Sequence, residues 1–201
     1  MQYSEPIKKL IANFSAMPGL GDKTAERLVF NLLKKNNKNT FIEFANALIT
    51  VGKQIRHCKI CNNYSEKPLC QICENMRRDK TKICVVAEAQ DIICLEKTSV
   101  YHGLYHVLGG LIEPISNITP DKLNIKSLIE RLNDKQIREI IFGLNPTIEG
   151  ESTIIYIKKM IGQKFKNIKL TRLSRGLPMG ADIEYADEIT LSNAINNRSQ
   201  L

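Results

Sequence analysis

Four cysteines in the first half of the chain have the spacing of a metal site. Cys58 and Cys61 form one C-x2-C pair, and Cys70 and Cys73 form a second pair after an eight-residue gap. A two-residue spacer lets both sulfurs of one pair face the same ion, and tetrahedral zinc takes four thiolates. Since four protein ligands leave no open coordination position, we expect one structural Zn²⁺ ion here rather than a catalytic one.

Two other chemistries fit four cysteines. An iron–sulfur cluster also takes four thiolates, and a C-x2-C pair can serve as a thioredoxin-like redox pair, although the βαβ setting of such a pair is missing around residue 58. His57 precedes the first ligand and is expected to be a bystander, because four thiolates complete the shell. Cys84 and Cys94 lie in apolar segments and are expected to be buried small hydrophobic residues.

Residues 17–28 (MPGLGDKTAERL) contain a Pro-Gly-hydrophobe-Gly turn between two predicted helices, the second of which Asp22 can cap. The amide groups at the start of that helix can bind phosphate. Lys23 and Arg27 are four residues apart and share one face beside them. This pattern is typical of a helix-hairpin-helix, which grips the DNA backbone without reading bases. A plain helical hairpin is the alternative. A nucleotide-binding P-loop is excluded, because a helix precedes the turn and Asp22 replaces the required glycine.

The net charge of +8 is concentrated in one part of the chain. Residues 1–82 hold 15 Lys and Arg against 7 Asp and Glu, whereas residues 83–201 hold 14 of each. A basic module joined to a neutral one favours a polyanionic partner, with nucleic acid as the first candidate and solvated lysines as the alternative. No apolar run reaches the length of a membrane span, and no signal peptide is visible. We therefore expect a cytoplasmic protein with no membrane partner.

Hydrophobic periodicity predicts helices first and then a strand–helix alternation. The second and third helices carry apolar stripes that we expect to be buried: Ala25, Leu28, Val29 and Leu32 in the second, and Phe41, Phe44, Ala45, Leu48 and Val51 in the third. The predicted helices cover residues 5–15, about 23–33 after the Asp22 cap, about 40–56, 91–97, 125–132 and 150–161, and the predicted strands 83–87, 105–108, 139–144 and 168–173. A polar linker is expected at 34–39. The alternation after residue 81 predicts an α/β layered domain with a largely parallel sheet.

The order of these motifs, together with NPTIEGE (145–151) and RGLPMGADIEYADEITL (175–191), resembles the RecR family of bacterial recombination mediators over nearly the entire chain. The resemblance implies a multidomain α+β protein with four parts: a helix-hairpin-helix domain at 1–56, a four-cysteine zinc finger at 57–80, an α/β Toprim domain at 81–172, and a C-terminal Walker-B-like segment with a helix at 173–201. It also implies dimers and ring-shaped tetramers that can encircle DNA. Family members work with RecO, and in many bacteria with RecF, to load RecA on gapped DNA coated by single-strand-binding protein.

The resemblance also implies roles for single residues. Cys58, Cys61, Cys70 and Cys73 match the zinc ligands, Lys23 and Arg27 the DNA-facing positions, Glu149 and Glu151 a candidate contact region for RecO, and Asp187 a segment where subunits meet.

Catalytic Toprim domains hold Mg²⁺ with a Glu after the first strand and an Asp-x-Asp after a later one. Here Ala87 stands at the first position, where many family members keep a Glu, and Glu88 follows one step along. Asn145-Pro146-Thr147 stands at the second position. A one-residue slip moves a side chain to the other face of a strand, so Glu88 is a doubtful substitute. We expect a DNA-binding mediator and not an enzyme. The alternatives are a Mg²⁺-dependent Toprim enzyme that cleaves or ligates nucleic acid, and a zinc-ribbon scaffold that binds only protein.

Overall fold

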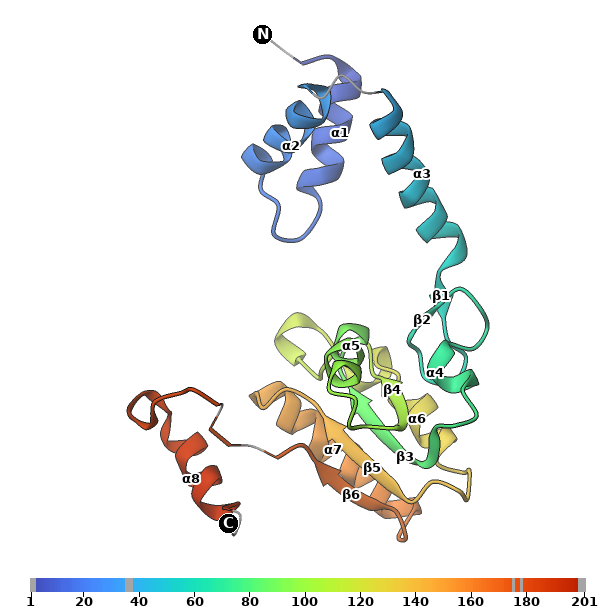
Figure 1. Ribbon diagram of the computed structural model, residues 1–201, viewed down its shortest axis with the longest axis vertical. Coiled ribbons are helices and arrows are strands. Elements are labelled where there is room, and N and C mark those ends of the chain that lie inside the picture. Colours follow the sequence, from blue (N-terminus) through green and yellow to red (C-terminus); the bar gives the residue numbers. More distant parts are fainter. Residues whose placement is uncertain (1–2, 35–37, 175, 178, 199–201) are drawn as a thin grey trace. The chain divides into compact units, whose positions relative to one another are not determined.

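The computed structural model describes residues 3–34, 38–174, 176–177 and 179–198. The chain divides into two compact units, residues 1–55 and 56–201, each described here by itself (Figure 1). The expected linker at 34–39 is shorter than predicted, because Lys34 ends α2 and residues 38–39 begin α3; the remaining residues, 35–37, lie outside the described residues. None of the helices in the described part of the chain is long and apolar enough to cross a membrane.

The first unit consists of three helices, α1 (Glu5–Ser15), α2 (Asp22–Lys34) and α3 (Lys38–Gln54). Gly19 has a φ of 81°, which favours glycine and allows the tight turn after α1. The expected cap of α2 is displaced by one residue. The carbonyl of Gly21 accepts hydrogen bonds from the amides of Thr24 and Ala25 at 2.9 and 3.0 Å, so Gly21 is the N-cap and Asp22 is the first helical residue.

Aromatic contacts and two buried aliphatic residues hold the first unit together. Ala25 and Val29 of α2 are fully buried, as predicted. The rings of Tyr3 and Phe30 lie 5.2 Å apart, and those of Phe14 and Phe44 stack at 6.3 Å, which joins α3 to α1.

The predicted burial of the apolar stripe on α3 is wrong for the single chain. Phe44, Leu48 and Val51 are 39%, 54% and 60% exposed, and Ala45 is exposed as well. Leu28 on α2 is 38% exposed, and only Phe41 and Leu32 are partly buried as expected. The physical reason is that three helices in one chain offer too little facing surface to cover every apolar stripe, so helical periodicity reports which face is apolar and not what covers it.

The second unit begins with a small antiparallel ribbon, β1 (Arg56–His57) and β2 (Tyr64–Ser65), followed by the one-turn helix α4 (Gln71–Glu74). A four-stranded sheet follows, with strand order β4-β3-β5-β6 and every neighbouring pair parallel, as predicted. The remaining elements of this unit are β3 (Asp79–Val86), α5 (Ala89–Lys97), β4 (Gly103–Val107), α6 (Ile125–Arg131), β5 (Glu139–Gly143), α7 (Ile148–Lys164), β6 (Lys169–Arg172) and α8 (Glu188–Asn196), with short 3-10 turns at Pro114–Ser116, Pro120–Lys122 and Ile183–Tyr185.

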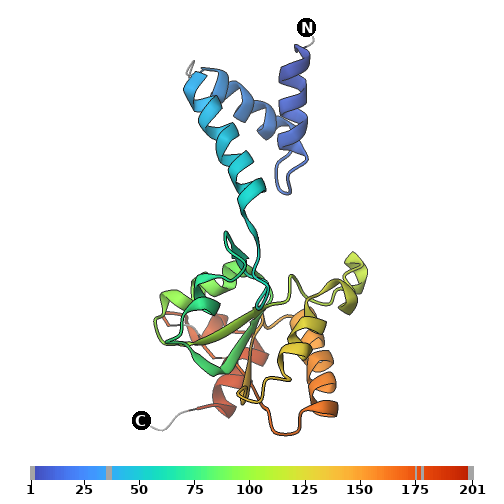
Figure 2. The same ribbon diagram turned by 90° about the vertical axis from the view of Figure 1, so that its right-hand side faces the viewer.

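Successive side chains of β3 point to opposite faces of the sheet, and each face is covered by a hydrophobic core. Ile83 and Val85 join the larger core under α6 and α7, whereas Cys84 and Val86 join a smaller core under α5. Figure 2 shows α6 and α7 together on one side of the strands and α5 on the other. The apolar run ICVV is therefore a strand covered on both faces.

The outer edge of β4, which has no neighbouring strand in the sheet, is covered by groups from other segments. The Val107 amide donates to the carbonyl of Cys61 at 2.8 Å. The carbonyls of Gly103 and Tyr105 accept from the guanidinium groups of Arg78 and Arg131, at 3.3 and 2.6 Å. The cysteine region is thus attached to the sheet through the edge of β4.

Candidate zinc centre and nucleic-acid interface

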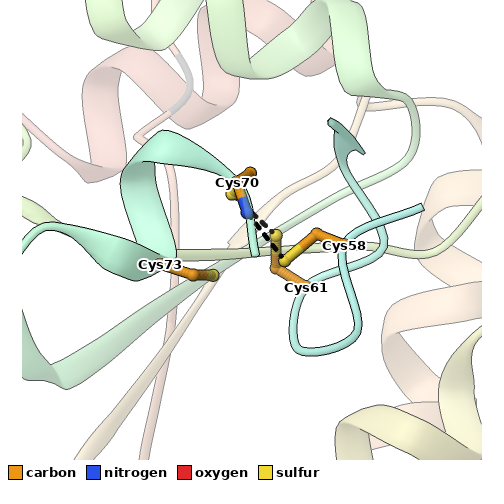
Figure 3. Close-up of side chains that lie close together, drawn as sticks. All are labelled: Cys58, Cys61, Cys70 and Cys73. Carbon is orange, nitrogen blue, oxygen red and sulfur yellow. Dashed lines mark hydrogen bonds between the residues drawn. The ribbon is translucent and has the colours of Figure 1, made fainter. Parts of the chain in front are cut away.

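Two short turns bring the four cysteines together. After β1, the Asn62 amide donates to the Cys58 carbonyl at 3.0 Å, and the Cys58 amide donates to the Asn63 carbonyl at 2.7 Å. Asn62 adopts a positive φ of 60°, which closes this turn and places Cys58 and Cys61 side by side. Cys70 is the N-cap of α4, and Cys73 lies one turn along that helix. The four sulfurs lie within 4.8 Å of one another and face a common centre (Figure 3).

The geometry and the donor set fit a tetrahedral zinc ion. Zn–S bonds of about 2.3 Å place the sulfurs of a tetrahedral site about 3.8 Å apart, and the sulfurs of Cys61 and Cys70 are 3.5 Å apart. The Cys70 amide donates to the sulfur of Cys58 at 3.3 Å, a contact that favours a thiolate at Cys58. Cys58, Cys61 and Cys70 are buried and Cys73 is partly buried, so the site is largely shielded from solvent, as suits a structural site.

The thiols strongly influence one another's ionisation. Hydrogen bonding with Cys70 raises the pKa of Cys61 to about 12, and hydrogen bonds from Cys61 and Cys73 lower the pKa of Cys70. One thiolate is thus stabilised by protonated neighbours, because four adjacent thiolates repel each other without a cation among them. Zinc binding therefore has to release protons, and metal affinity depends on pH.

His57 lies outside the group of converging ligand atoms. Its Nδ1 atom is 3.1 Å from the Asn62 carbonyl, and its ring lies 5.2 Å from that of Tyr64. These contacts agree with the expected bystander role.

The helix-hairpin-helix turn places its two basic side chains at the start of α2. Lys23 and Arg27 are both exposed, while Ala25 and Val29 on the opposite face are buried. The cations therefore project to solvent beside the N-terminus of a 13-residue helix, where backbone amides and the helix dipole attract anions. This arrangement can hold phosphate groups without reading bases.

The acidic residues near the ends of β3 and β5 have local structural partners. Glu88 is the N-cap of α5 and forms a capping box with Asp91, whose carboxylate accepts from the Glu88 amide at 2.8 Å. Glu151 pairs with Arg172 at 3.3 Å. Hydrogen bonds from the Glu149 amide and from the Thr147 hydroxyl lower the pKa of Glu149, which is partly exposed. Within the described residues, the four cysteines form the one group of three or more potential ligands.

Asp187 lies at the start of the C-terminal helix. Its carboxylate accepts hydrogen bonds from the amide and hydroxyl of Thr190 at 2.8 and 2.7 Å, so Asp187 is the N-cap of α8. These hydrogen bonds lower the pKa of Asp187. Its side chain sets where α8 begins, and a role in subunit contact would act through the position of that helix.

Sequence reasoning missed several residues and misplaced one cysteine. Cys84 is buried, as expected, and burial raises its pKa to about 12, but Cys94 on α5 is exposed. The ion pair between Arg78 and Glu96, which lowers the pKa of Glu96, also escaped prediction. Arg131 gave no signal either, because a cation in the last turn of a helix usually faces solvent.

Comparisons with known proteins match every part of this organisation. Four family models match: the RecR helix-hairpin-helix at 7–51, the RecR zinc finger domain with four cysteines at 55–75, the Toprim domain at 81–174 and the RecR C-terminal segment at 176–199. The chain is 46% identical to the recombination protein RecR of Staphylococcus haemolyticus strain JCSC1435, and equally to those of Staphylococcus aureus strains Mu3 and Newman. Each alignment covers 201 residues and the whole of both chains. Together with the converging sulfurs, the zinc-finger match makes the four-cysteine cluster a structural zinc site.

Proposed function

The chain belongs to the RecR family of recombination proteins, and from this premise we propose that it is a DNA-binding recombination mediator in DNA repair. The observation that carries the proposal is the helix-hairpin-helix turn with Lys23 and Arg27 exposed at the start of α2. Its contacts are of the kind that position a protein on the phosphate backbone, so binding is independent of base sequence.

We further propose that the protein acts as a homodimer or a ring-shaped homotetramer that encloses DNA. The support is the uncovered apolar stripe of α3, formed by Phe44, Leu48 and Val51 at positions i, i+4 and i+7, which are 39%, 54% and 60% exposed. A contiguous exposed apolar surface of this kind marks an interaction site. A second copy of the chain is the occupant that the family resemblance suggests.

In this proposal the assembled protein works in the cytoplasm with RecO, and in some organisms with RecF, to load RecA on gapped DNA coated by single-strand-binding protein. Glu149 supports a contact with a basic partner, because its partly exposed side chain lies in the first turn of α7, beside Glu151. Complementary charge across an interface steers association and fixes its register.

We propose that the protein carries out no chemical step on DNA. Ala87 cannot act as a metal ligand, and Glu88 and Asp91 are engaged in capping α5. Thr147 at the Asp-x-Asp position is the N-cap of α7 and accepts from the Gly150 amide at 3.2 Å. These residues have local structural roles that need no magnesium ion.

Light scattering with gapped DNA, in the presence and absence of RecO, tests these proposals together. We expect an oligomer that shifts to a larger, salt-sensitive complex when DNA is added. A chain that binds RecO but no DNA under any of these conditions would support the protein-only scaffold. Mg²⁺-dependent nicking, ligation or relaxation of plasmid by the purified protein would support the enzyme.

A further inference from the structure

Two contacts on the outer edge of β4 place an arginine beside the first pair of zinc ligands. Residues 105 and 107 of a strand direct their backbone groups to the same edge. On that edge, the Val107 amide donates to the Cys61 carbonyl at 2.8 Å, and the Tyr105 carbonyl accepts from Nη1 of Arg131 at 2.6 Å. Arg131 and the 58–61 turn therefore bind to the same edge of β4, at positions two residues apart.

Part of this guanidinium is buried and has unused hydrogen-bonding capacity. Nη2 of Arg131 is inaccessible to solvent and has no hydrogen-bond partner within the described part of the chain. No carboxylate among the described residues forms an ion pair with it. An arginine remains protonated in proteins, so a partly buried positive charge has no ion-pair partner within the described residues, and one of its N–H groups is buried and unsatisfied.

The cysteines are the anionic groups that act on this charge. Burial lowers the pKa of Arg131, and the charges of Cys73, Cys61 and Cys58 oppose that effect, ahead of a smaller contribution from Tyr101. The other ionisable group nearby is His106, which is buried. Burial lowers its pKa to about 4, and its Nε2 atom lies 2.9 Å from the Asn124 carbonyl, so it is neutral near pH 7 and adds no charge.

A zinc ion with four thiolates carries a net charge of −2 in a closed, poorly solvated site. Such a charge is costly to bury without a counter-charge, and N–H groups around the sulfurs orient the ligands and tune their basicity. We propose that Arg131 is the counter-charge of the zinc–thiolate centre, so that metal binding clamps the cysteine turns onto the edge of β4. Arg131 is a positioning residue in this arrangement and ligates no metal.

A second polar contact joins the same two segments. The side-chain amide of Asn62, in the first cysteine turn, donates to the hydroxyl of Ser127 on α6 at 3.2 Å. Arg131 lies one turn further along α6. One helix of the Toprim domain thus contacts the zinc finger through a neutral hydrogen bond and, in our proposal, through a charge that is balanced only when the metal site is formed.

The experiment compares three variants of the full chain. Arg131→Met keeps much of the side-chain volume without charge, Arg131→Lys keeps the charge without the planar fork, and Lys126→Met is the control, because Lys126 is exposed on the same helix. Zinc transfer to a colorimetric chelator is timed under native conditions. We expect release about tenfold faster for Arg131→Met, an intermediate rate for Arg131→Lys, and an unchanged rate for the control.

Cobalt substitution and melting separate this role from a purely structural one. Loss of a cation beside the sulfurs should shift the sulfur-to-cobalt charge-transfer band of Arg131→Met to longer wavelength. Its loss of thermal stability should be larger in zinc-loaded than in metal-free protein. An unchanged band, or an equal loss with and without metal, would show that Arg131 serves only the Tyr105 carbonyl. If Arg131→Met does not fold, Arg131→Gln, which also removes the charge, is judged by the same band and release rate.

Discussion

The two units of the chain differ in how their apolar surfaces are covered. In residues 56–198, α5 covers one face of the sheet and α6 and α7 cover the other, and the zinc finger covers its β4 edge. In residues 3–34 and 38–55, Ala25 and Val29 are the hydrophobic residues that become fully buried, while α3 keeps an exposed apolar face. The Toprim sheet is therefore covered within one chain and its β4 edge depends on the metal site, whereas α3 in the first unit keeps an apolar face uncovered, as does α8 at the end of the second, where Ile189 and Ile195 are 71% and 64% exposed.

Metal removal should have the largest effect on stability, and this effect should be confined to the second unit. Cys70→Ser, or treatment with a strong chelator, is expected to abolish zinc binding and lower the melting temperature by roughly 10 °C or more, since metal binding at such a site is folding free energy. Bound zinc by mass spectrometry and melting by calorimetry measure both. If the purified protein contains no metal and its melting temperature is unchanged by the chelator, the second unit does not depend on zinc and this difference between the units is wrong.

A charge placed on the exposed face of α3 should affect assembly and leave the metal site intact. Leu48→Glu is expected to weaken self-association by about 100-fold or more. The free-energy cost of burying a carboxylate adds to the loss of the favourable free energy from burying the leucine side chain. Sedimentation measures this, with Lys53→Glu on the same helix as the control. If Leu48→Glu assembles like the parent protein, another surface completes the first unit.

Neutralising the basic residues of the hairpin should reduce DNA affinity in a salt-dependent way. Lys23→Ala and Arg27→Ala are each expected to weaken binding to gapped DNA of any sequence and to reduce the slope of log affinity against log salt by about one. Lys9→Ala on α1 is a suitable control, and the titration should be repeated with RecO. A double variant that binds as well as the parent protein would remove the hairpin from the interface.

The smallest effect is expected at the acidic start of α7. Glu149→Lys should weaken the complex with RecO several-fold while zinc content and melting temperature remain unchanged, because this side chain is partly exposed at the surface and outside the hydrophobic core. Pull-down at several salt concentrations measures the loss, with Glu149→Gln as the variant that removes charge without reversing it. If the parent protein cleaves or relaxes plasmid DNA and Glu149→Gln abolishes this activity, Glu149 would instead be a catalytic residue.

The pattern of residue types predicted the elements better than it predicted their surroundings. The strand around ICVV and its parallel neighbours were predictable because period and apolar content are local properties. The cysteine ligands were predictable because their spacing in sequence enforces closeness in space. The exposure of Leu48 was not predictable, since an apolar stripe looks the same whether its partner is in the same chain or in another.

Arg131 and Cys94 illustrate a second limit. Each lies on a helix whose sequence is compatible with either a buried or an exposed position at that residue. Which of the two it adopts depends on contacts between segments far apart in the chain. Arg131 is drawn inward by a carbonyl on β4, 26 residues earlier, and Cys94 falls on the outward face of α5. Neither outcome is written in the neighbouring residues.

The covered edge of β4 bears on how the protein avoids aggregation. A strand with unpaired amides and carbonyls can recruit a strand from another molecule, and proteins protect such edges by covering them or by placing charges on them. At the opposite edge of the sheet, β6 carries Lys169 and Arg172, and at β4 the cover is supplied by the first cysteine turn and two arginines. Protein that loses its zinc would uncover this edge, so metal starvation should promote intermolecular strand pairing before it unfolds the Toprim core.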